Sequence, residues 1–183
     1  MRRSFVLVLA AAGILLAGAV ISVPADVSQN VRVNIKEIEA FSYCGLPHSG
    51  SFSDLSTVLN GLLGSMSSQN IAPSGDLIAI YHLSPSGEMP DRIEYEVGFP
   101  ITAQVLPQPP LQKKEWQYLQ VAYAEHRGDY DDSADTIDEM LNWIDAQGYM
   151  QEGPILARFL VIPSDDVRTR DLRTEIWIPI TKK

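Results

Sequence analysis

The sequence predicts an α+β fold in which two copies of a βαββ unit form one antiparallel sheet with both helices on one face. Residues 48–52 (HSGSF) correspond to residues 126–130 (HRGDY) at an offset of 78, and after a one-residue slip 96–101 (EVGFPI) correspond to 175–180 (EIWIPI). Each repeat also contains one helical pattern followed by two short strand-like runs. A duplicated unit of this size predicts pseudo-two-fold symmetry, with a ligand groove on the axis where the halves meet.

The first repeat is assigned to residues 31–104. Its opening apolar residues alternate with polar ones in two short runs, which indicates a bent or interrupted first strand. A helix is expected over residues 54–67, where apolar side chains recur at three- and four-residue spacing. Ser53 or Asp54 is expected to cap this helix by accepting from a backbone N–H. The strands that complete the unit are expected over residues 77–83 and 93–101.

A proline-rich link over residues 105–111 separates the repeats, and the second repeat occupies residues 112–181 within a domain that extends to residue 183. Apolar spacing predicts a helix over residues 132–147, and Gly148 is expected to end it. The strands of this repeat are expected over residues 118–125, 155–162 and 172–180.

Residues 1–25 have the pattern of a secretion signal, and residues 26–30 form a polar spacer. Two arginines precede a charge-free apolar run over residues 5–21, and small residues follow at 23–25. The run is longer than a usual signal core and short for a membrane span of about 20 residues. A cleaved signal peptide and an uncleaved membrane anchor are therefore both open. Either interpretation predicts an exported domain, periplasmic or attached to the inner membrane.

Charge and cysteine content restrict the partners and the chemistry. The net charge of −9 disfavours nucleic acid, because phosphates would be repelled, and it favours solubility or the attraction of cations. The single cysteine, Cys44, allows no internal disulfide and is expected in the core.

Strand alternation divides the last strand of repeat two into two faces. Ile176, Ile178 and Ile180 fall on one face, which should meet the helices, while Glu175 and Trp177 fall on the other. A carboxylate beside an indole is a natural receptor for a cation, through charge and a cation–π attraction of about 0.5–2 kcal/mol. Glu175 and Trp177 are therefore the principal candidate ligand contacts.

The same alternation in repeat one directs Val97, Phe99 and Ile101 toward the core and Glu96 and Gly98 toward the groove. Glu96 is a further candidate contact. Gly98 is expected to face Trp177 across the axis, which would leave the groove open on the Gly98 side and walled on the Trp177 side. Four tyrosines are candidate groove residues: Tyr43, Tyr123, Tyr95 and Tyr118.

No metal, cofactor or established catalytic motif is indicated. His48 and His126 hold equivalent positions before glycine, which indicates a shared turn, and no acidic or cysteine cluster lies near them with metal-ligand spacing. A haem ligand from His82 or His126 has no supporting motif. Nucleophile-elbow, phosphate-loop and zinc-protease motifs are absent, which leaves Glu175 as the one candidate general acid or base.

The second repeat resembles a known family in the order and spacing of several short motifs. These are HRGDY at 126–130, WI at 143–144, GY at 148–149, GP at 153–154 and LRTEIWIP at 172–179. Together with the duplication, they resemble the GyrI-like small-molecule-binding domain, the effector-binding domain of AraC-type and multidrug-responsive transcription activators, over residues 31–181.

This resemblance implies two βαββ units around a ligand groove, a ligand that is often an apolar cation, a groove glutamate at Glu175, and neither metal nor organic cofactor. The sequence lacks the regulators' helix-turn-helix and carries the export signal, so the expected function is binding of a small amphiphilic molecule, cationic or apolar. Two alternatives stay open: a hydrolase of a small strained or electrophilic compound that uses Glu175, and a protein-interaction module of the cell envelope.

Overall fold

The computed structural model describes residues 31–51, 54–81, 93–162 and 166–183. The expected leader at 1–25 and spacer at 26–30 lie outside these ranges. No helix of the described ranges is long and apolar enough to cross a membrane.

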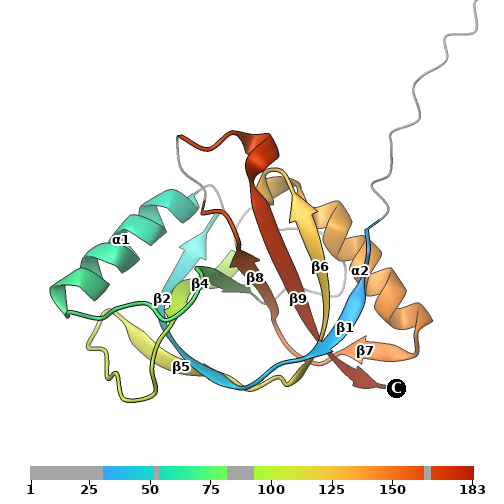
Figure 1. Cartoon of the computed structure of the whole chain (residues 1–183), viewed down its shortest axis with the longest axis horizontal. Helices are drawn as coiled ribbons and strands as arrows, with labels where there is room; N and C mark the ends of the chain where they lie inside the picture. The colour runs from blue at the N-terminus through green and yellow to red at the C-terminus, as the bar shows by residue number, and fades with distance from the viewer. Residues whose placement is uncertain (1–30, 52–53, 82–92, 163–165) are drawn as a thin grey trace, which may run out of the picture.

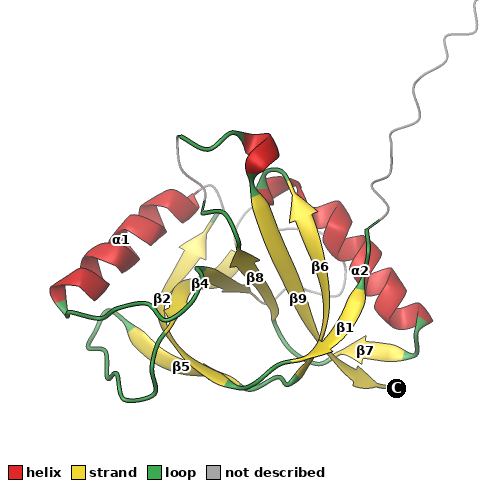
Figure 2. Cartoon of the chain, viewed as in Figure 1, coloured by secondary structure: helices red, strands yellow, loops and turns green. Residues whose placement is uncertain are grey.

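In the described ranges, one antiparallel sheet of nine strands forms the centre of the fold (Figures 1 and 2). Eight strands follow the order β1-β6-β9-β8-β3-β4-β2-β5, and β7 pairs with β9 beside this path. The strands are β1 (Asn34–Glu37), β2 (Phe41–Gly50), β3 (Ile78–Tyr81), β4 (Ile93–Pro100), β5 (Gln112–Trp116), β6 (Gln120–Arg127), β7 (Tyr149–Gln151), β8 (Ile155–Phe159) and β9 (Arg173–Lys182).

The pseudo-two-fold axis passes between β3 and β8, which pair with each other at the middle of the sheet. One half contains β5, β2, β4 and β3, and the other contains β1, β6, β9 and β8. The two edge strands are exchanged between the halves. β1 comes just before β2 in the chain but pairs with β6 in the other half. β5 comes just before β6 but pairs with β2. Figure 1 shows the chain passing along the lower edge from β1 beside β6 to β2 beside β4. The interrupted first strand is therefore confirmed as two strands, one in each half.

The two helices agree with the sequence prediction to within about two residues. α1 (Leu55–Ser68) and α2 (Ala134–Ala146) pack on the same face of the sheet, against opposite halves. The predicted cap by Asp54 is wrong, because its carboxylate makes no capping bond and instead lies 3.2 Å from His48 Nε2. Ser53 lies outside the described residues. Gly148 follows α2 with φ of 78°, a conformation that favours glycine, as predicted.

Two strands were not predicted from the sequence. β5 (QKKEW) is a polar edge strand, and β7 has three residues, so neither carries the hydrophobic alternation of a half-buried strand.

The core lies between the sheet and the helices, and strand alternation predicted its members. Ile176, Ile178 and Val97 point to this side and are fully buried, as is Cys44. Burial raises the pKa of the Cys44 thiol. A smaller cluster lies on the opposite face, called here the second face; its buried members are Tyr43, Ile78, Ile80, Trp116, Val121, Leu156 and Trp177.

Candidate functional site

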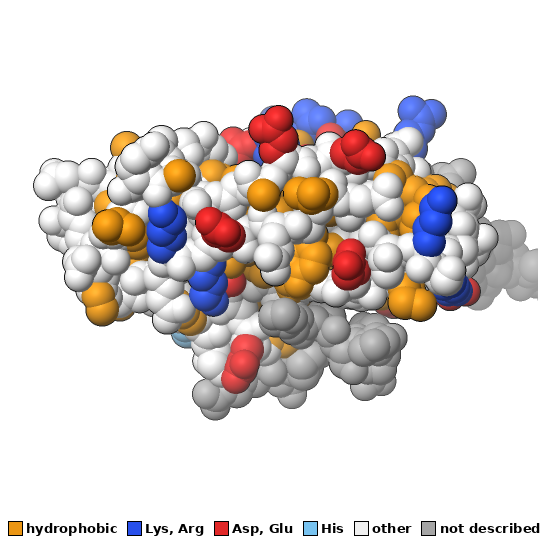
Figure 3. Space-filling view, turned by 90° about the horizontal axis from the view of Figure 1, so that it is seen from below, with side chains coloured by type: hydrophobic (Ala, Val, Ile, Leu, Met, Phe, Trp, Pro, Cys, Tyr) orange, Lys and Arg blue, Asp and Glu red, His pale blue; other side chains and the backbone are white. Residues whose placement is uncertain are grey.

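The candidate site lies on the second face, which β4 and β9 supply with one glutamate each. Glu96 is the register partner of Ile80 on β3, and Glu175 is the register partner of Arg158 on β8. Because partner residues in a sheet share a face, both carboxylates lie on the side away from the helices. Seen from below the view of Figure 1, hydrophobic side chains lie in several separate patches across the molecule, with single charges of both signs among them (Figure 3).

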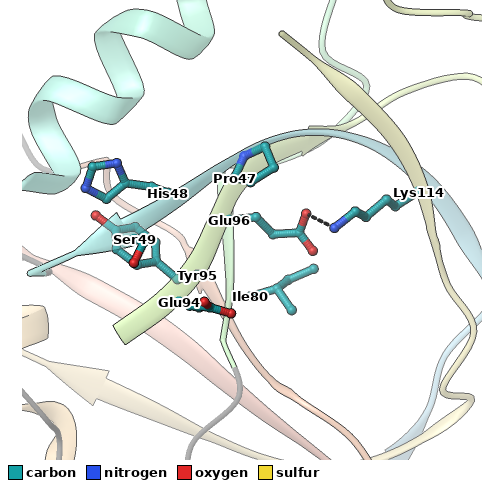
Figure 4. A pocket seen from close by; sticks show the side chains of 8 residues that line it. All are labelled: Pro47, His48, Ser49, Ile80, Glu94, Tyr95, Glu96 and Lys114. Atoms are coloured by element: carbon teal, nitrogen blue, oxygen red, sulfur yellow. Dashed lines mark ion pairs between the residues drawn. The ribbon is translucent and has the colours of Figure 1, made fainter. Parts of the chain in front are cut away.

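The half that contains Glu96 has a pocket of about 510 Å³, called here the Glu96 pocket (Figure 4). The side chains that line it come from β2, β3, β4 and β5: Pro47, His48, Ser49, Ile80, Glu94, Tyr95, Glu96 and Lys114. Pro47 and Ile80 supply apolar surface, while two carboxylates and one ammonium supply charge. This combination suits an amphiphilic ligand of ordinary drug-like size.

Glu96 is held in place by a hydrogen bond and an ion pair. The Tyr43 hydroxyl donates to Glu96 Oε1 at 2.7 Å, and Lys114 Nζ lies 2.8 Å from Oε2. The Glu96 side chain is 12% exposed. Burial, and after it the bond to this carboxylate, raise the pKa of Tyr43, so its hydroxyl remains protonated and donating. Gly45 leaves room for this carboxylate, because a Cβ at that position would lie 3.0 Å from Glu96 Oε2.

The other half contains the Glu175 corner, formed by Glu175, Lys36, Arg158, Trp177 and Tyr123. Lys36 Nζ lies 2.5 Å from Glu175 Oε1, and Arg158 Nη1 lies 3.1 Å from Oε2. The same Lys36 nitrogen lies 4.2 Å from the centre of the Trp177 ring and 4.4 Å from that of Tyr123. Both carboxylate oxygens of Glu175 therefore have cationic partners within the protein.

Three exchanges between the repeats make the two halves of the second face different in shape. Gly45, Ile80 and Gly98 in repeat one correspond, by the offsets of the duplication, to Tyr123, Arg158 and Trp177 in repeat two. The larger side chain is in repeat two each time. The Gly45–Gly98 and Tyr123–Trp177 pairs are also register partners on adjacent strands. The second half thus has larger side chains than the first half at these three positions.

The structure divides the predicted contacts into two groups. Glu175, Trp177 and Tyr123 lie together in the Glu175 corner, and Glu96 and Tyr43 lie together beside the Glu96 pocket. Their roles in ligand binding stay predictions, as do the hydrolase and interaction-module alternatives.

The other two candidate tyrosines have different surroundings. Tyr95 points to the helix side, donates to the Ser51 carbonyl at 3.1 Å and borders the pocket. Tyr118 packs on Trp116, with ring centres 5.0 Å apart.

Sequence reasoning missed Lys36, Lys114 and Arg158. A signal for the two lysines was present, because they are separated by the same 78 residues as the motifs of the duplication. Because the edge strands are exchanged, Lys36 on β1 reaches Glu175 in repeat two. Lys114 on β5 reaches Glu96 in repeat one in the same way.

The histidines have local partners. His126 is buried, with Nδ1 2.9 Å from the Thr136 hydroxyl and Nε2 2.8 Å from the Asp129 carbonyl. His48 pairs with Asp54 and stands edge-on to the Tyr95 ring. In the described ranges no three His, Cys, Asp or Glu side chains are grouped to hold a metal. His82 lies outside those ranges.

The chain belongs to the GyrI-like small-molecule-binding domain family, whose model matches residues 31–181. The C-terminal domain of EcmrR has a similar fold, with a TM-score of 0.73 and 14% identity over 84% of this chain and 99% of that domain. The EcmrR chain in a complex with DNA matches with a TM-score of 0.72 and 14% identity over 84% of this chain, which spans 58% of that chain's length.

A hydrolase from Listeria innocua has a TM-score of 0.60 and 9% identity over 82% of this chain and 92% of that one. SAV2435 bound to tetraphenylphosphonium has a TM-score of 0.55 and 11% identity over 82% of this chain and 94% of that one. At these identities the similarity shows the fold alone. A search of curated proteins gave no match to the chain.

Proposed function

We propose that this protein binds a small amphiphilic molecule, cationic or apolar, in the Glu96 pocket. The observation that carries the proposal is the pocket itself, in which a largely buried carboxylate faces the apolar side chains of Pro47 and Ile80. Its volume of about 510 Å³ lies within the range of small-molecule sites, roughly 300–1,000 Å³. Membership of a small-molecule-binding family supports the same function.

Charge in the pocket favours a cation over an anion. Glu94 and Glu96 contribute two negative charges and Lys114 one positive charge, so these three side chains together carry a net charge of −1. The protein as a whole carries −9, which adds a long-range attraction for cations. Lys114 is 41% exposed and stands at the rim, where a ligand could displace it toward solvent.

Isothermal titration of the purified chain with three probes of related shape tests the proposal. The probes are tetraphenylphosphonium (a cation), tetraphenylborate (an anion) and triphenylphosphine oxide (neutral). We expect the cation to bind more tightly than the neutral probe, and the neutral probe more tightly than the anion. Glu96→Gln should lower the affinity for the cation about tenfold, which corresponds to one charge interaction of about 1.4 kcal/mol in a partly hydrated site.

The effect of Glu96→Gln is compared with that of removing two other carboxylates, one at a time. Glu125→Gln removes the same charge from an exposed network with Arg173, away from the pocket lining, and should leave the affinity for the cation nearly unchanged. Glu175→Gln tests the other half of the sheet. A loss of cation affinity in Glu175→Gln without a loss in Glu96→Gln would place the site in the Glu175 corner and contradict the proposal. The absence of binding by all three probes would also contradict it.

We further propose that the domain is exported, on the strength of the charge, apolar and small-residue pattern of residues 1–25. Fusion of alkaline phosphatase, which is active only outside the bacterial cytoplasm, to the C-terminus of the full chain tests this. Activity that is lost when residues 1–25 are deleted supports export. The mass of the exported protein distinguishes a cleaved signal peptide from a retained anchor, and an inactive fusion would contradict the proposal.

A further inference from the structure

The Glu175 corner has the composition of a receptor for an organic ammonium ion, and a side chain of the protein fills it. A carboxylate lies beside the rings of Trp177 and Tyr123, and the Lys36 ammonium lies within 4.4 Å of both ring centres and 2.5 Å from Glu175 Oε1. Ring faces and a carboxylate are the two features by which proteins hold alkylammonium groups. The Glu175 side chain is 13% exposed and that of Lys36 is 26% exposed, so the ion pair is largely withdrawn from water.

The equivalent lysine in the other half has no such arrangement around it. Lys114 pairs with Glu96 at 2.8 Å, but glycine occupies the two positions that correspond to Trp177 and Tyr123. Among the described residues, Lys36 alone of these two lysines lies over aromatic rings. The duplication thus provides two lysine–glutamate pairs of the same origin, one enclosed by aromatic rings and one at the rim of a pocket.

Tethering gives Lys36 an advantage over any free cation. The edge strand β1 is paired with β6 along its four residues, which fixes the backbone of Lys36 beside the corner. A tethered group acts at an effective concentration of about the millimolar range or higher. A free ammonium ion must displace Lys36 before it can contact Glu175, and this requirement lowers its apparent affinity for the corner.

We propose that Lys36 is a specificity-determining residue that closes the Glu175 corner to cationic ligands and leaves the Glu96 pocket as the site for ligand. The class of ligand that the corner excludes is a primary or quaternary alkylammonium. The proposal deepens the proposed function by assigning ligand to one half of the sheet. Its test uses a different probe at a different place, so its failure can be distinguished from failure of ligand binding in the pocket.

Chemical rescue tests the assignment. Lys36→Ala removes three methylene groups and the ammonium, which together match n-propylammonium, and the chain also offers the matched control Lys114→Ala. Unfolding temperature and the ¹H–¹⁵N spectrum are measured while n-propylammonium chloride is added at constant ionic strength, and 1-propanol serves as the neutral isostere. The indole N–H of Trp177 is a suitable reporter, because it is buried and has no hydrogen-bond partner among the described residues. The variant Trp177→Phe assigns its signal.

We expect n-propylammonium to bind Lys36→Ala at least about tenfold more tightly than it binds wild type or Lys114→Ala, as two cation–π contacts and a charge pair imply. Binding should raise the unfolding temperature of Lys36→Ala and shift the Trp177 indole signal, and 1-propanol should do neither. Lys36→Met, which keeps the length of the side chain without its charge, should leave the corner filled and show no response. Equal affinity for wild type and Lys36→Ala would overturn the proposal, as would an equal response in Lys36→Met.

Discussion

Replacement of Tyr43 by phenylalanine tests whether the Glu96 carboxylate is held by a buried donor. The Tyr43 hydroxyl donates to Glu96 Oε1 at 2.7 Å, and the tyrosine is almost fully buried. Removal of this hydroxyl leaves the Glu96 carboxylate, which is 12% exposed, paired with the Lys114 ammonium. A hydrogen bond to a charged group contributes about 1.5–3 kcal/mol, so Tyr43→Phe should lower the free energy of unfolding by about 2 kcal/mol.

Urea unfolding monitored by circular dichroism measures this free energy, and thermal unfolding provides a second measure. For a domain of this size, about 2 kcal/mol corresponds to a fall of roughly 4–8 °C in the unfolding temperature. Tyr123→Phe is the matched control, because the Tyr123 hydroxyl makes no hydrogen bond to the described residues, and it should change stability by less than about 0.5 kcal/mol. Equal losses of stability in the two variants would refute the reasoning about Glu96.

Four other substitutions test the packing and the electrostatics of the fold. Gly98→Ala should lower the free energy of unfolding by about 1–3 kcal/mol in urea, because its Cβ would lie 2.5 Å from a carbonyl oxygen of the neighbouring strand. In Gly64→Ala, the Cβ added to α1 meets no atom within 4 Å, so this substitution should stabilise the protein by about 0.4–1 kcal/mol in the same assay. Leu62→Ala should cost about 2–5 kcal/mol by the same assay, because Leu62 is fully buried on the face of α1 that packs against the core. Hydrogen bonding from Arg173 holds the pKa of Glu125 below its ordinary value. The ionised Glu125 therefore stabilises the fold at pH values above the ordinary carboxyl pKa, and this stabilisation is lost as the pH falls through the lowered pKa of the folded state. Glu125→Gln should therefore lose less stability than wild type as the pH falls below the ordinary carboxyl pKa, and an unchanged pH profile would contradict this.

Local patterns in the sequence were sufficient to predict most of the fold. The alternation in β9 placed Ile176 with the helices and Trp177 on the opposite face, because neighbouring residues in a strand point to opposite sides. The three- and four-residue spacing of apolar side chains located both helices. These features depend on residues that are close together in the chain.

The exchange of edge strands could not be predicted in the same way. β5 is mostly polar, and its pairing with β2 depends on contacts between residues about 70 apart in sequence, such as Tyr43 and Lys114. The ionic partners of Glu96 and Glu175 follow from this exchange, so they were missed as well. Comparison of the repeats position by position would have paired Lys36 with Lys114, although it would not have shown which glutamate each lysine reaches.

A crystal structure of the protein with tetraphenylphosphonium bound tests the central claim most directly. The account predicts the probe in the Glu96 pocket, with its rings against Ile80 and Pro47 and its charge toward Glu96, while Lys36 remains on Glu175. A probe seated on Glu175 and Trp177 with Lys36 displaced, or one bound away from both carboxylates, would contradict the account.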